Sequence, residues 1–315
     1  MARSYGGRRR NSGGGIIISV IAAVAILIGL YFGVFDGALP SPKEDIGTST
    51  GLDDSLMQVH AIDVGQADSI LLRIPSGNGV KNILIDAGTS SGHKATIITD
   101  YLNECGVKTL DYFVLTHPHS DHIAGAKTVL SKFDVKNVMI PDCDYSTATW
   151  AGILETIAEK DINVIFPEVK QKISVGDAVI TVLAPCEKLL GPNEDANNYS
   201  IVLKVVYGET SFMFTGDAHT ESEAEMLKTF SAAELKCDVL KMGHHGSSTS
   251  SSEEFLRAVD PDTVLISVGE GNSYGHPHEE TLEKIEKYGY NVFRTDMDGT
   301  IVLSSDGKTV SRVKE

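Results

Sequence analysis

The segment at residues 115–125 reads LTHPHSDHIAG, and it gathers His117, His119, Asp121 and His122 within six positions of a chain that has 10 histidines. Imidazole nitrogens and carboxylate oxygens are the ligands that a borderline divalent cation prefers. A hydrophobic core gains nothing from burying these four side chains together. The chain must therefore fold so that they either bind a metal or remain in a solvated surface loop.

Further candidate ligands follow the ends of predicted strands. The run YFVLT precedes the first histidines, SFMFTG precedes Asp217, and DVLKMG precedes His244 and His245. Residues at strand ends along one edge of a sandwich can converge on a single cleft. The candidate ligands from distant segments can therefore build one site.

Short β-branched runs such as SILLRI, NILIDAG and AVITVLAP alternate with helical patterns, which predicts an α/β protein with mixed sheets. The apolar periodicity predicts helices at residues 95–105, 124–132, 147–160, 253–259 and 279–288.

The N-terminal part of the chain predicts a membrane anchor. Residues 16–35 are uncharged and mostly apolar, which is about the length that spans a bilayer. Four arginines precede this span within the tail at residues 1–15, so the positive-inside rule places the N-terminus in the cytoplasm and the rest of the chain outside the membrane. A cleavable signal peptide is the alternative, although its apolar region is normally only about 7–15 residues long.

Residues 36–55 read as a linker, because they are rich in Gly, Ser, Thr, Pro and charge, and the folded domain is expected at residues 56–315. Beyond the four arginines, 23 basic residues face 43 acidic ones, which gives a formal charge near −20. Such a charge repels a polyphosphate at long range and disfavours non-specific binding of nucleic acid. The four cysteines lack C-x-x-C spacing and are expected as buried free thiols, with one or two disulfides as the alternative.

With these residues identified, the sequence resembles the metallo-β-lactamase superfamily, and more closely the hydrolase domain of ComEC-like competence proteins in a stand-alone, tethered form. The resemblance spans about residues 56–305 and is carried by AIDVGQADSILLRI, NILIDAG, LDYFVLTHPHSDHIAG, NNYSIVLKVVYGETSFMFTGDA, DVLKMGHHGSSTS, YGHPHEETLEKI and RTDMDGTIVLSSDG. It implies a four-layer αβ/βα sandwich with a dinuclear metal site on one edge.

The resemblance also implies a ligand for each position of that site. His117 and His119 would hold the first divalent cation, and Asp121 and His122 would hold the second. Asp217 would bridge the two cations. Either His245 or His244 would complete the second site, and the other histidine would donate a hydrogen bond or face the substrate.

One departure from the superfamily pattern affects the first site. No histidine occurs from Ile123 to Thr215, where the superfamily usually has one, and the segment DANNYS with Asn197, Asn198 and Ser200 stands at that place. The first site is therefore expected to have an open position or an amide ligand and to be weak or empty. Its metal is expected to be zinc or a harder cation such as manganese.

Several other residues receive two interpretations. His276 is expected either to contact substrate or transfer a proton, or to belong to an ordinary helix start. Ser247 and Ser248 would hold a phosphate or form a flexible loop, and Asn198 and Ser200 are further candidates for substrate binding. His219 is expected as an exposed residue at a helix start. The segment DVGQAD, with Asp63, Gln66 and Asp68, is expected at the turn nearest the site.

The sequence thus predicts a metal-dependent phosphodiesterase, with extracellular DNA as the substrate that the resemblance implies. Asp121 and Asp217 would fix the metals, and His244, His245 or His276 would protonate the leaving group. The first alternative is a hydrolase of a small or cell-wall phosphodiester such as phosphorylcholine on a wall polymer. The second alternative is a tethered binding module that keeps a metal only for structure.

Overall fold

The computed structural model describes residues 48–49, 52–89, 96–191 and 194–313, all of which belong to one compact unit. Among these described residues, no helix has the length and hydropathy needed to cross a bilayer. The predicted span at residues 16–35 lies outside the described residues, and the anchor therefore stays a prediction.

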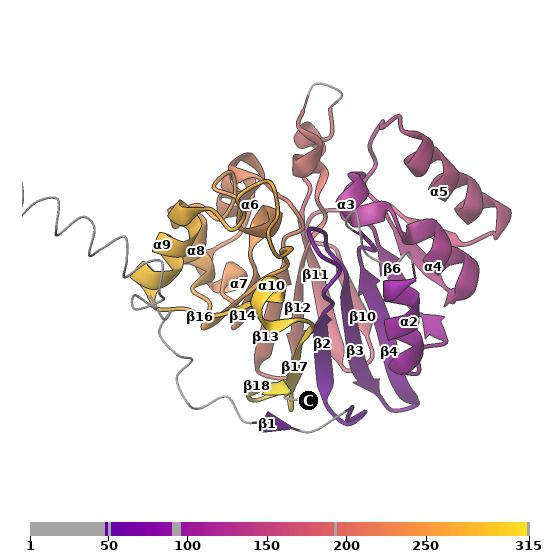
Figure 1. Ribbon diagram of the computed structural model, residues 1–315, viewed down its shortest axis with the longest axis horizontal. Helices are drawn as coiled ribbons and strands as arrows, with labels where there is room; N and C mark the ends of the chain where they lie inside the picture. Colours follow the sequence, from indigo (N-terminus) through magenta and orange to yellow (C-terminus); the bar gives the residue numbers. More distant parts are fainter. Residues whose placement is uncertain (1–47, 50–51, 90–95, 192–193, 314–315) are drawn as a thin grey trace, which may run out of the picture. The chain divides into compact units, whose positions relative to one another are not determined.

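Two β-sheets face each other in the centre of the fold (Figure 1). The strands of the first sheet, in spatial order, are β1 (Thr48–Ser49), β18 (Val310–Val313), β17 (Ile301–Ser305), β2 (Met57–Ala61), β3 (Ile70–Ser76), β4 (Gly79–Ile85), β6 (Tyr112–Val114), β8 (Asn137–Met139) and β9 (Asn163–Ile165). Strand β1 comes from the segment predicted as a linker and pairs in parallel with β18.

The second sheet has seven strands and is also mixed, with antiparallel pairing up to β13 and parallel pairing beyond it. Its strands, in spatial order, are β10 (Lys172–Val175), β11 (Ala178–Ala184), β12 (Val202–Tyr207), β13 (Thr210–Phe214), β14 (Val239–Lys241), β15 (Thr263–Ile266) and β16 (Asn291–Arg294). A small additional sheet pairs β5 (Thr109–Leu110) with β7 (Asp134–Val135).

Alternation along the strands explains how the two sheets pack. In β3, Ile70 and Leu72 enter the core between the sheets, whereas Leu71 lies in a separate core under the helices on the outer face. In β13, Phe212 and Phe214 face the same inner core and Met213 faces outward. Both faces of these strands are therefore buried, which is why their sequences read as continuous apolar runs.

Helices cover the outer face of each sheet, and this confirms the predicted four-layer sandwich (Figure 1). The first sheet is covered by α2 (Ile97–Glu104), α4 (Ala126–Lys132) and α5 (Ala148–Glu159). The second sheet is covered by α6 (Thr220–Thr229), α8 (Glu253–Val259) and α9 (Glu279–Tyr288). Shorter helices are α3 (Ser120–Ile123), α7 (Ala232–Leu235), α10 (Thr295–Asp298), η1 (Glu187–Leu189), η2 (Ala196–Tyr199) and η3 (Gly243–Gly246).

The predicted helices at 95–105, 124–132, 147–160, 253–259 and 279–288 are all present, with bounds that differ by at most two residues at either end. All four cysteines are free thiols, and of these Cys105 and Cys237 are buried. Cys143 and Cys186 are only partly buried, so the expectation of buried free thiols holds for two of the four.

The topology also decides where polar residues can meet. Strands β4 and β6 run parallel in the first sheet, and β13, β14 and β15 run parallel in the second. The carboxyl ends of parallel strands meet at one edge of a sheet. The segments that follow these strands therefore gather at one end of the sandwich, next to α3 at the top of Figure 1.

A buried histidine in β2 lies apart from that edge. The His60 side chain is fully buried, and its Nδ1 atom lies 2.8 Å from the Tyr101 hydroxyl. Burial, together with the positive charge of Arg73, lowers the pKa of His60 to about 3. His60 is therefore neutral in the folded chain at any pH near neutrality.

This lowered pKa predicts a loss of stability in acid. The unfolded chain takes up a proton near pH 6.5 and the folded chain does not, so stability is complete above pH 6.5 and falls by about 1.4 kcal/mol for each unit below it. We expect His60→Gln to flatten the profile of unfolding free energy between pH 6.5 and 4, measured by urea denaturation. The two profiles should run parallel from pH 7 to 8, and an unchanged slope in acid would contradict the assignment.

Candidate metal centre

Asp86 directly follows β4 and organises one half of the site. Its backbone has a positive φ of 61°, which turns a fully buried carboxylate toward the neighbouring strand end. Its Oδ1 accepts the backbone N–H of Thr116, and its Oδ2 accepts the Thr116 hydroxyl and the Nδ1–H of His122, each at 2.7 Å. In the neutral ring, this hydrogen bond places the proton of His122 on Nδ1 and leaves a lone pair on Nε2. Without a cation, the carboxylates of Asp217 and Asp86 outweigh burial and raise the pKa of His122.

His117 and His119 lie between β6 and α3. The Thr116 hydroxyl donates to Asp86, so it can accept the Nδ1–H of His117 at 3.1 Å. This leaves the Nε2 lone pair of His117 facing Nδ1 of His119 at 3.1 Å. His117 is fully buried and His119 is partly exposed, so the pair connects the interior to the surface.

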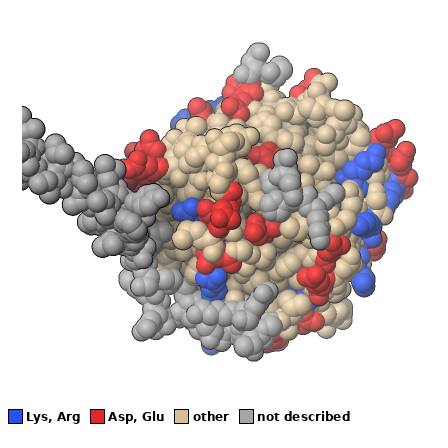
Figure 2. All heavy atoms as spheres, viewed as in Figure 1, with Lys and Arg blue, Asp and Glu red and all other residues tan. Residues whose placement is uncertain are grey.

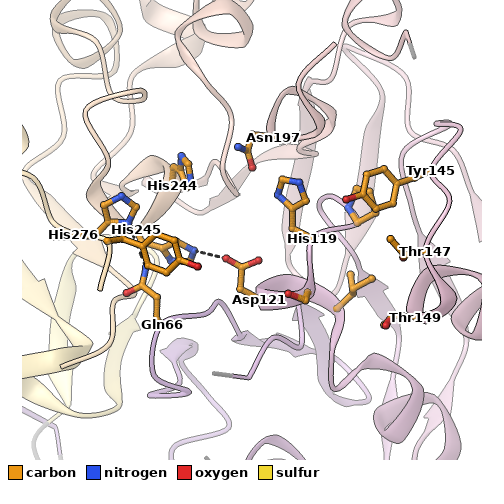
Figure 3. Close-up of a pocket in the computed structure, with 14 residues that line it drawn as sticks. Gln66, His119, Asp121, Tyr145, Thr147, Thr149, Asn197, His244, His245 and His276 are labelled. Atoms are coloured by element: carbon orange, nitrogen blue, oxygen red, sulfur yellow. Dashed lines mark hydrogen bonds and ion pairs between the residues drawn. The ribbon is translucent and has the colours of Figure 1, made fainter. Parts of the chain in front are cut away.

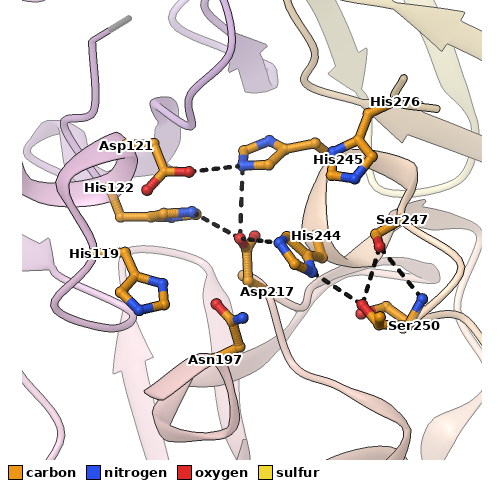
Figure 4. A network of polar contacts seen from close by, with 12 residues as sticks. His119, Asp121, His122, Asn197, Asp217, His244, His245, Ser247, Ser250 and His276 are labelled. Carbon is orange, nitrogen blue, oxygen red and sulfur yellow. Dashed lines mark hydrogen bonds and ion pairs between the residues drawn. The ribbon is translucent and has the colours of Figure 1, made fainter. Parts of the chain in front are cut away.

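The second sheet brings Asp217 and His245 to the same place. Asp121, His122, Asp217 and His245 offer ligand atoms that all lie within 4.8 Å of one another. Oδ2 of Asp217 lies 3.2 Å from Nε2 of His122 and 3.6 Å from Nε2 of His245, which in turn lies 3.4 Å from Oδ2 of Asp121 (Figure 4). The four residues come from two sheets and form one compact cluster.

The two neighbouring histidines of η3 have different environments. Both have left-handed backbones, with φ values of 50° and 54°, which separate their side chains. His245 is buried and donates its Nδ1–H to the carbonyl of Ser267 at 2.9 Å, leaving Nε2 for the cluster. His244 lines the pocket, with Nε2 3.7 Å from Oδ2 of Asp217. Of the two alternatives, the geometry favours His245 as the ligand of the second site.

The cluster fits a divalent cation on its own geometry. Within the described residues, the buried atoms without a hydrogen-bond partner include Nε2 of His122, Nε2 of His245 and Oδ1 of Asp217. Buried polar atoms are rarely left unsatisfied, and imidazoles held at one nitrogen with the other one free are typical of metal ligands. The lone pairs that a cation requires are therefore present and oriented.

A buried lysine lies beneath this cluster. Nζ of Lys241 lies 2.5 Å from Oδ2 of Asp68 and 3.7 Å from Oδ1 of Asp217, and it donates to the carbonyl of Gly216 at 2.9 Å. Burial alone would lower the pKa of Lys241, but Asp68 and Asp217 outweigh it and raise that pKa. Lys241 is thus a permanent positive charge that compensates two buried carboxylates.

A pocket of about 400 Å³ opens directly onto the cluster (Figure 3). Its lining includes His119, Asp121, His244, His245 and His276, together with Asn197, Tyr145 and Tyr274 from three loops. No lysine or arginine of the described part of the chain lines this pocket. Its polarity therefore comes from imidazoles, hydroxyls, amides and one carboxylate.

His276 presents a defined donor to the pocket. Oε1 of Gln66 accepts the backbone N–H of Gly269, which orients the Gln66 amide so that its Nε2 donates to Nδ1 of His276 at 3.3 Å. The neutral His276 ring consequently carries its proton on Nε2. Burial and the neighbouring His244 and His245 lower the pKa of His276 to about 4.

Comparison with known proteins agrees with this architecture. The family model described as the metallo-beta-lactamase superfamily matches residues 62–270, which is most of the described chain. The chain belongs to the metallo-β-lactamase superfamily. This is a superfamily of metal-dependent hydrolases, and the match spans every residue of the four-residue cluster.

Within the superfamily, the chain is similar to competence proteins. It is 33% identical over 261 residues to "ComE operon protein 3" of Bacillus subtilis and 31% identical over 239 residues to "Competence protein ComA" of Neisseria gonorrhoeae. These matches cover 78% and 76% of the chain but only 32% and 31% of the relatives. The chain thus spans about a third of the length of the curated relatives, and the resemblance to a ComEC-like hydrolase domain is confirmed.

Solved structures support the fold. The metallo-beta-lactamase fold protein YhfI of Bacillus subtilis matches 79% of the chain and 99% of its own, with a TM-score of 0.51 and 15% identity. CmlA, a diiron beta-hydroxylase of Streptomyces venezuelae, matches 76% of the chain and 52% of its own, with a TM-score of 0.50 and 16% identity. At such low identity these likenesses show the fold alone.

Some residues predicted to bind substrate are placed elsewhere. Ser200 is fully buried, and its hydroxyl accepts the backbone N–H of Asp217 and lies 3.3 Å from Nδ1 of His117. Asn198 is buried, and its Oδ1 accepts the backbone N–H of His219. Ser247 is also buried and contacts the Thr249 hydroxyl, so only Ser248 of this predicted set is exposed. Ser200 and Asn198 position site residues and do not reach the pocket.

His219 was expected to be exposed, and this expectation is wrong. Its side chain retains only 12% exposure, because it packs against Asn197 and stacks on the His244 ring with centroids 5.2 Å apart. The residue does begin helix α6, as predicted. Its burial depends on the loop that carries η2, which the local sequence around His219 does not reveal.

Metal binding should stabilise the fold. A cation at about 100 times its dissociation constant adds about 2.7 kcal/mol, which for a domain of this size raises the melting temperature by about 5–10 °C. We expect Mn²⁺ or Zn²⁺ to produce this shift in scanning calorimetry of metal-stripped protein and Asp217→Ala to abolish most of it. The exposed Asp134→Ala variant should respond like the parent chain, and an equal shift in all three proteins would contradict the site.

Lys241 should be essential for stability through charge compensation. Replacing it by methionine leaves the buried carboxylates of Asp68 and Asp217 uncompensated, and breaking a buried ion pair costs about 3–5 kcal/mol. We expect this loss for Lys241→Met in urea unfolding of the metal-free protein. The double variant Lys241→Met/Asp68→Asn should recover a large part of it, and strictly additive losses would show that the two charges do not interact.

Proposed function

We propose that the chain is a metal-dependent phosphodiesterase that acts on DNA. The observation that carries the proposal is the four-residue cluster of Asp121, His122, Asp217 and His245, which opens onto a pocket with a neutral hydrogen-bond donor at His276. Divalent cations bound at such a cluster activate water and stabilise the oxygens of a phosphoryl displacement.

The residues of the chain itself have separate tasks in this proposal. Asp86 and Ser267 hold the imidazoles of His122 and His245 in their ligand tautomers. Nε2–H of His276 donates a hydrogen bond to a phosphate oxygen, because Gln66 occupies the other ring nitrogen. Asp121, whose side chain is 35% exposed, is the cluster residue that reaches furthest toward the substrate.

DNA is proposed as the substrate because of the names of the relatives, whereas the net charge of the chain gives it no support. Relatives that match more than three quarters of the chain bear the names "Competence protein ComA" and "Recombination protein 2", the latter from Haemophilus influenzae at 30% identity. The chain itself carries a net charge of −16. On the face seen in Figure 2, lysine and arginine side chains lie mainly at the right-hand edge beside acidic ones and form no continuous stripe.

A second candidate follows from that acidity. A small or wall-attached phosphodiester, such as phosphorylcholine on a wall polymer, would need no extended basic surface, and the pocket contains no lysine or arginine among its described lining. In both cases we propose zinc or manganese as the metal. We also propose that the span at residues 16–35 tethers the domain outside the membrane, which would give it access to either substrate.

The test is cleavage by metal-stripped protein reloaded with Mn²⁺ or Zn²⁺. We expect metal-dependent hydrolysis of single-stranded DNA and of bis-p-nitrophenyl phosphate, followed by gel electrophoresis and absorbance. Asp217→Ala should lower kcat/KM by about 100-fold or more, because it removes a carboxylate at the centre of the cluster. Asp134→Ala, an exposed change in β7 at a residue that does not line the pocket, should retain the parent activity.

The salt dependence of KM for DNA tests whether binding uses an extended basic surface. Because no basic residue lines the pocket, KM for DNA should change by less than about tenfold between 50 and 200 mM salt, whereas proteins with 6–10 phosphate contacts lose about 10³–10⁵ in affinity.

In the cleavage assay, hydrolysis of the small diester alone would favour the wall phosphodiester. Inactivity on both substrates, with metal bound, would favour the binding module.

A further inference from the structure

The His117–His119 pair lacks a third ligand of the usual kind. Their facing nitrogens lie 3.1 Å apart, yet neither residue belongs to the groups of His, Cys, Asp or Glu that could close around a cation in the described chain. No histidine occurs between residues 123 and 215 to complete a three-histidine site. Whatever completes the first site must therefore be a different chemical group.

Asn197 is the group beside this pair. It retains only 7% exposure, it lines the same pocket as His119, and both close-up views place its amide next to His119 (Figures 3 and 4). Its Oδ1 atom is buried and has no hydrogen-bond partner. A buried carbonyl oxygen is rarely left without a hydrogen-bond partner, so such an atom points to a ligand.

The direction of the amide is set by its neighbours. Asp195 caps η2 by accepting the backbone N–H of Asn197 at 2.9 Å, which fixes the start of this short helix. The Asn197 Nδ2 atom lies 3.1 Å from Nε2 of His219. Nδ1 of His219 lies 3.9 Å from Oδ2 of Asp195, and this carboxylate favours the proton on Nδ1. Nε2 of His219 is then an acceptor, and Oδ1 of Asn197 must point away from it.

The side-chain oxygen of the neighbouring Asn198 already accepts a hydrogen bond. Oδ1 of Asn198 accepts the backbone N–H of His219 at 3.3 Å, so Asn198 holds the His219 backbone while Asn197 contacts its ring. Of the two asparagines in DANNYS, only Asn197 therefore has a free oxygen.

We infer that Oδ1 of Asn197 takes the place of the missing third histidine as a protein ligand of the first divalent cation, beside His117 and His119, and that His219 is the positioning residue that aims it. The inference rests on the metal-dependent function proposed above. A carbonyl oxygen is a harder ligand than an imidazole and suits manganese better than zinc. The first site should accordingly bind Mn²⁺ more weakly than the cluster of Asp121, His122, Asp217 and His245.

The test is a Mn²⁺ titration of the metal-stripped full chain, followed by calorimetry and by the electron paramagnetic resonance signal of free Mn²⁺. We expect two binding steps of unequal affinity. Asn197→Ala should weaken the weaker step by at least tenfold and leave the tighter step within twofold. Asn197→Asp, which keeps the shape and adds a charge, should strengthen the weaker step. The matched control Asn103→Ala, an exposed change on α2 outside the pocket lining, should change neither step.

The role of His219 is tested by a double-variant cycle. His219→Ala should weaken the same step, and adding it to Asn197→Ala should cause no further loss, because both changes remove one ligand. A purely structural role of His219 would make the losses additive and would also affect the tighter step. Either of those outcomes would overturn the positioning role.

The following results would overturn the assignment of Asn197 as a ligand. A single Mn²⁺ bound by the parent chain, or two wild-type steps in Asn197→Ala, would overturn it. If Asn197→Ala fails to fold, the variant Asn197→Asp decides. A weaker Mn²⁺-binding step that is unchanged in Asn197→Asp would also overturn the ligand assignment. The titration needs no substrate, so two Mn²⁺ ions bound without any diester cleavage would refute the proposed function and leave the ligand assignment intact.

Discussion

Three carboxylates, those of Asp68, Asp86 and Asp217, are buried at one edge of the sandwich, and the surrounding structure compensates their charge. A carboxylate removed from water costs several kcal/mol unless it is paired and hydrogen-bonded. Lys241 lies against Asp68 and near Asp217, whereas Asp86 takes three hydrogen bonds from Thr116 and His122. The negative charge that these partners leave uncompensated faces the cluster that fits a cation.

This compensation also joins the two halves of the fold. Asp86 and His122 follow strands of the first sheet, while Asp217 and His245 follow strands of the second and Lys241 is the last residue of β14. The ligand atoms meet within 4.8 Å only because the inner core sets the distance between the sheets. The apolar packing and the metal site are therefore linked, since a shift of one sheet by an ångström would separate ligands that come from different sheets.

Much of the site could be predicted because its residue types are informative by themselves. Histidines and aspartates at strand ends predicted the cluster, and the same reasoning applied to NILIDAG would also have identified Asp86. Lys241 in the run DVLKMG also indicated a buried ion pair, because a lysine within a continuously buried strand needs an acidic partner. The roles of Ser200 and His219 could not be predicted, because each depends on a residue far away in the sequence. Ser200, directly after η2, contacts His117, and His219 contacts Asn197 of η2.

The acidic charge of the chain constrains how a phosphodiester can be held. At physiological ionic strength, charges further than about 8 Å from the bound phosphate are largely screened, so the net charge of −16 acts mainly on distant parts of a polymer. Near the reacting phosphate, the pocket offers imidazoles, hydroxyls and amides, and no lysine or arginine is among its described lining. The cations would then supply almost all of the local positive charge. Substrate affinity and catalysis would consequently depend on the same ions, and a metal-free form of the chain would have little attraction for a phosphodiester.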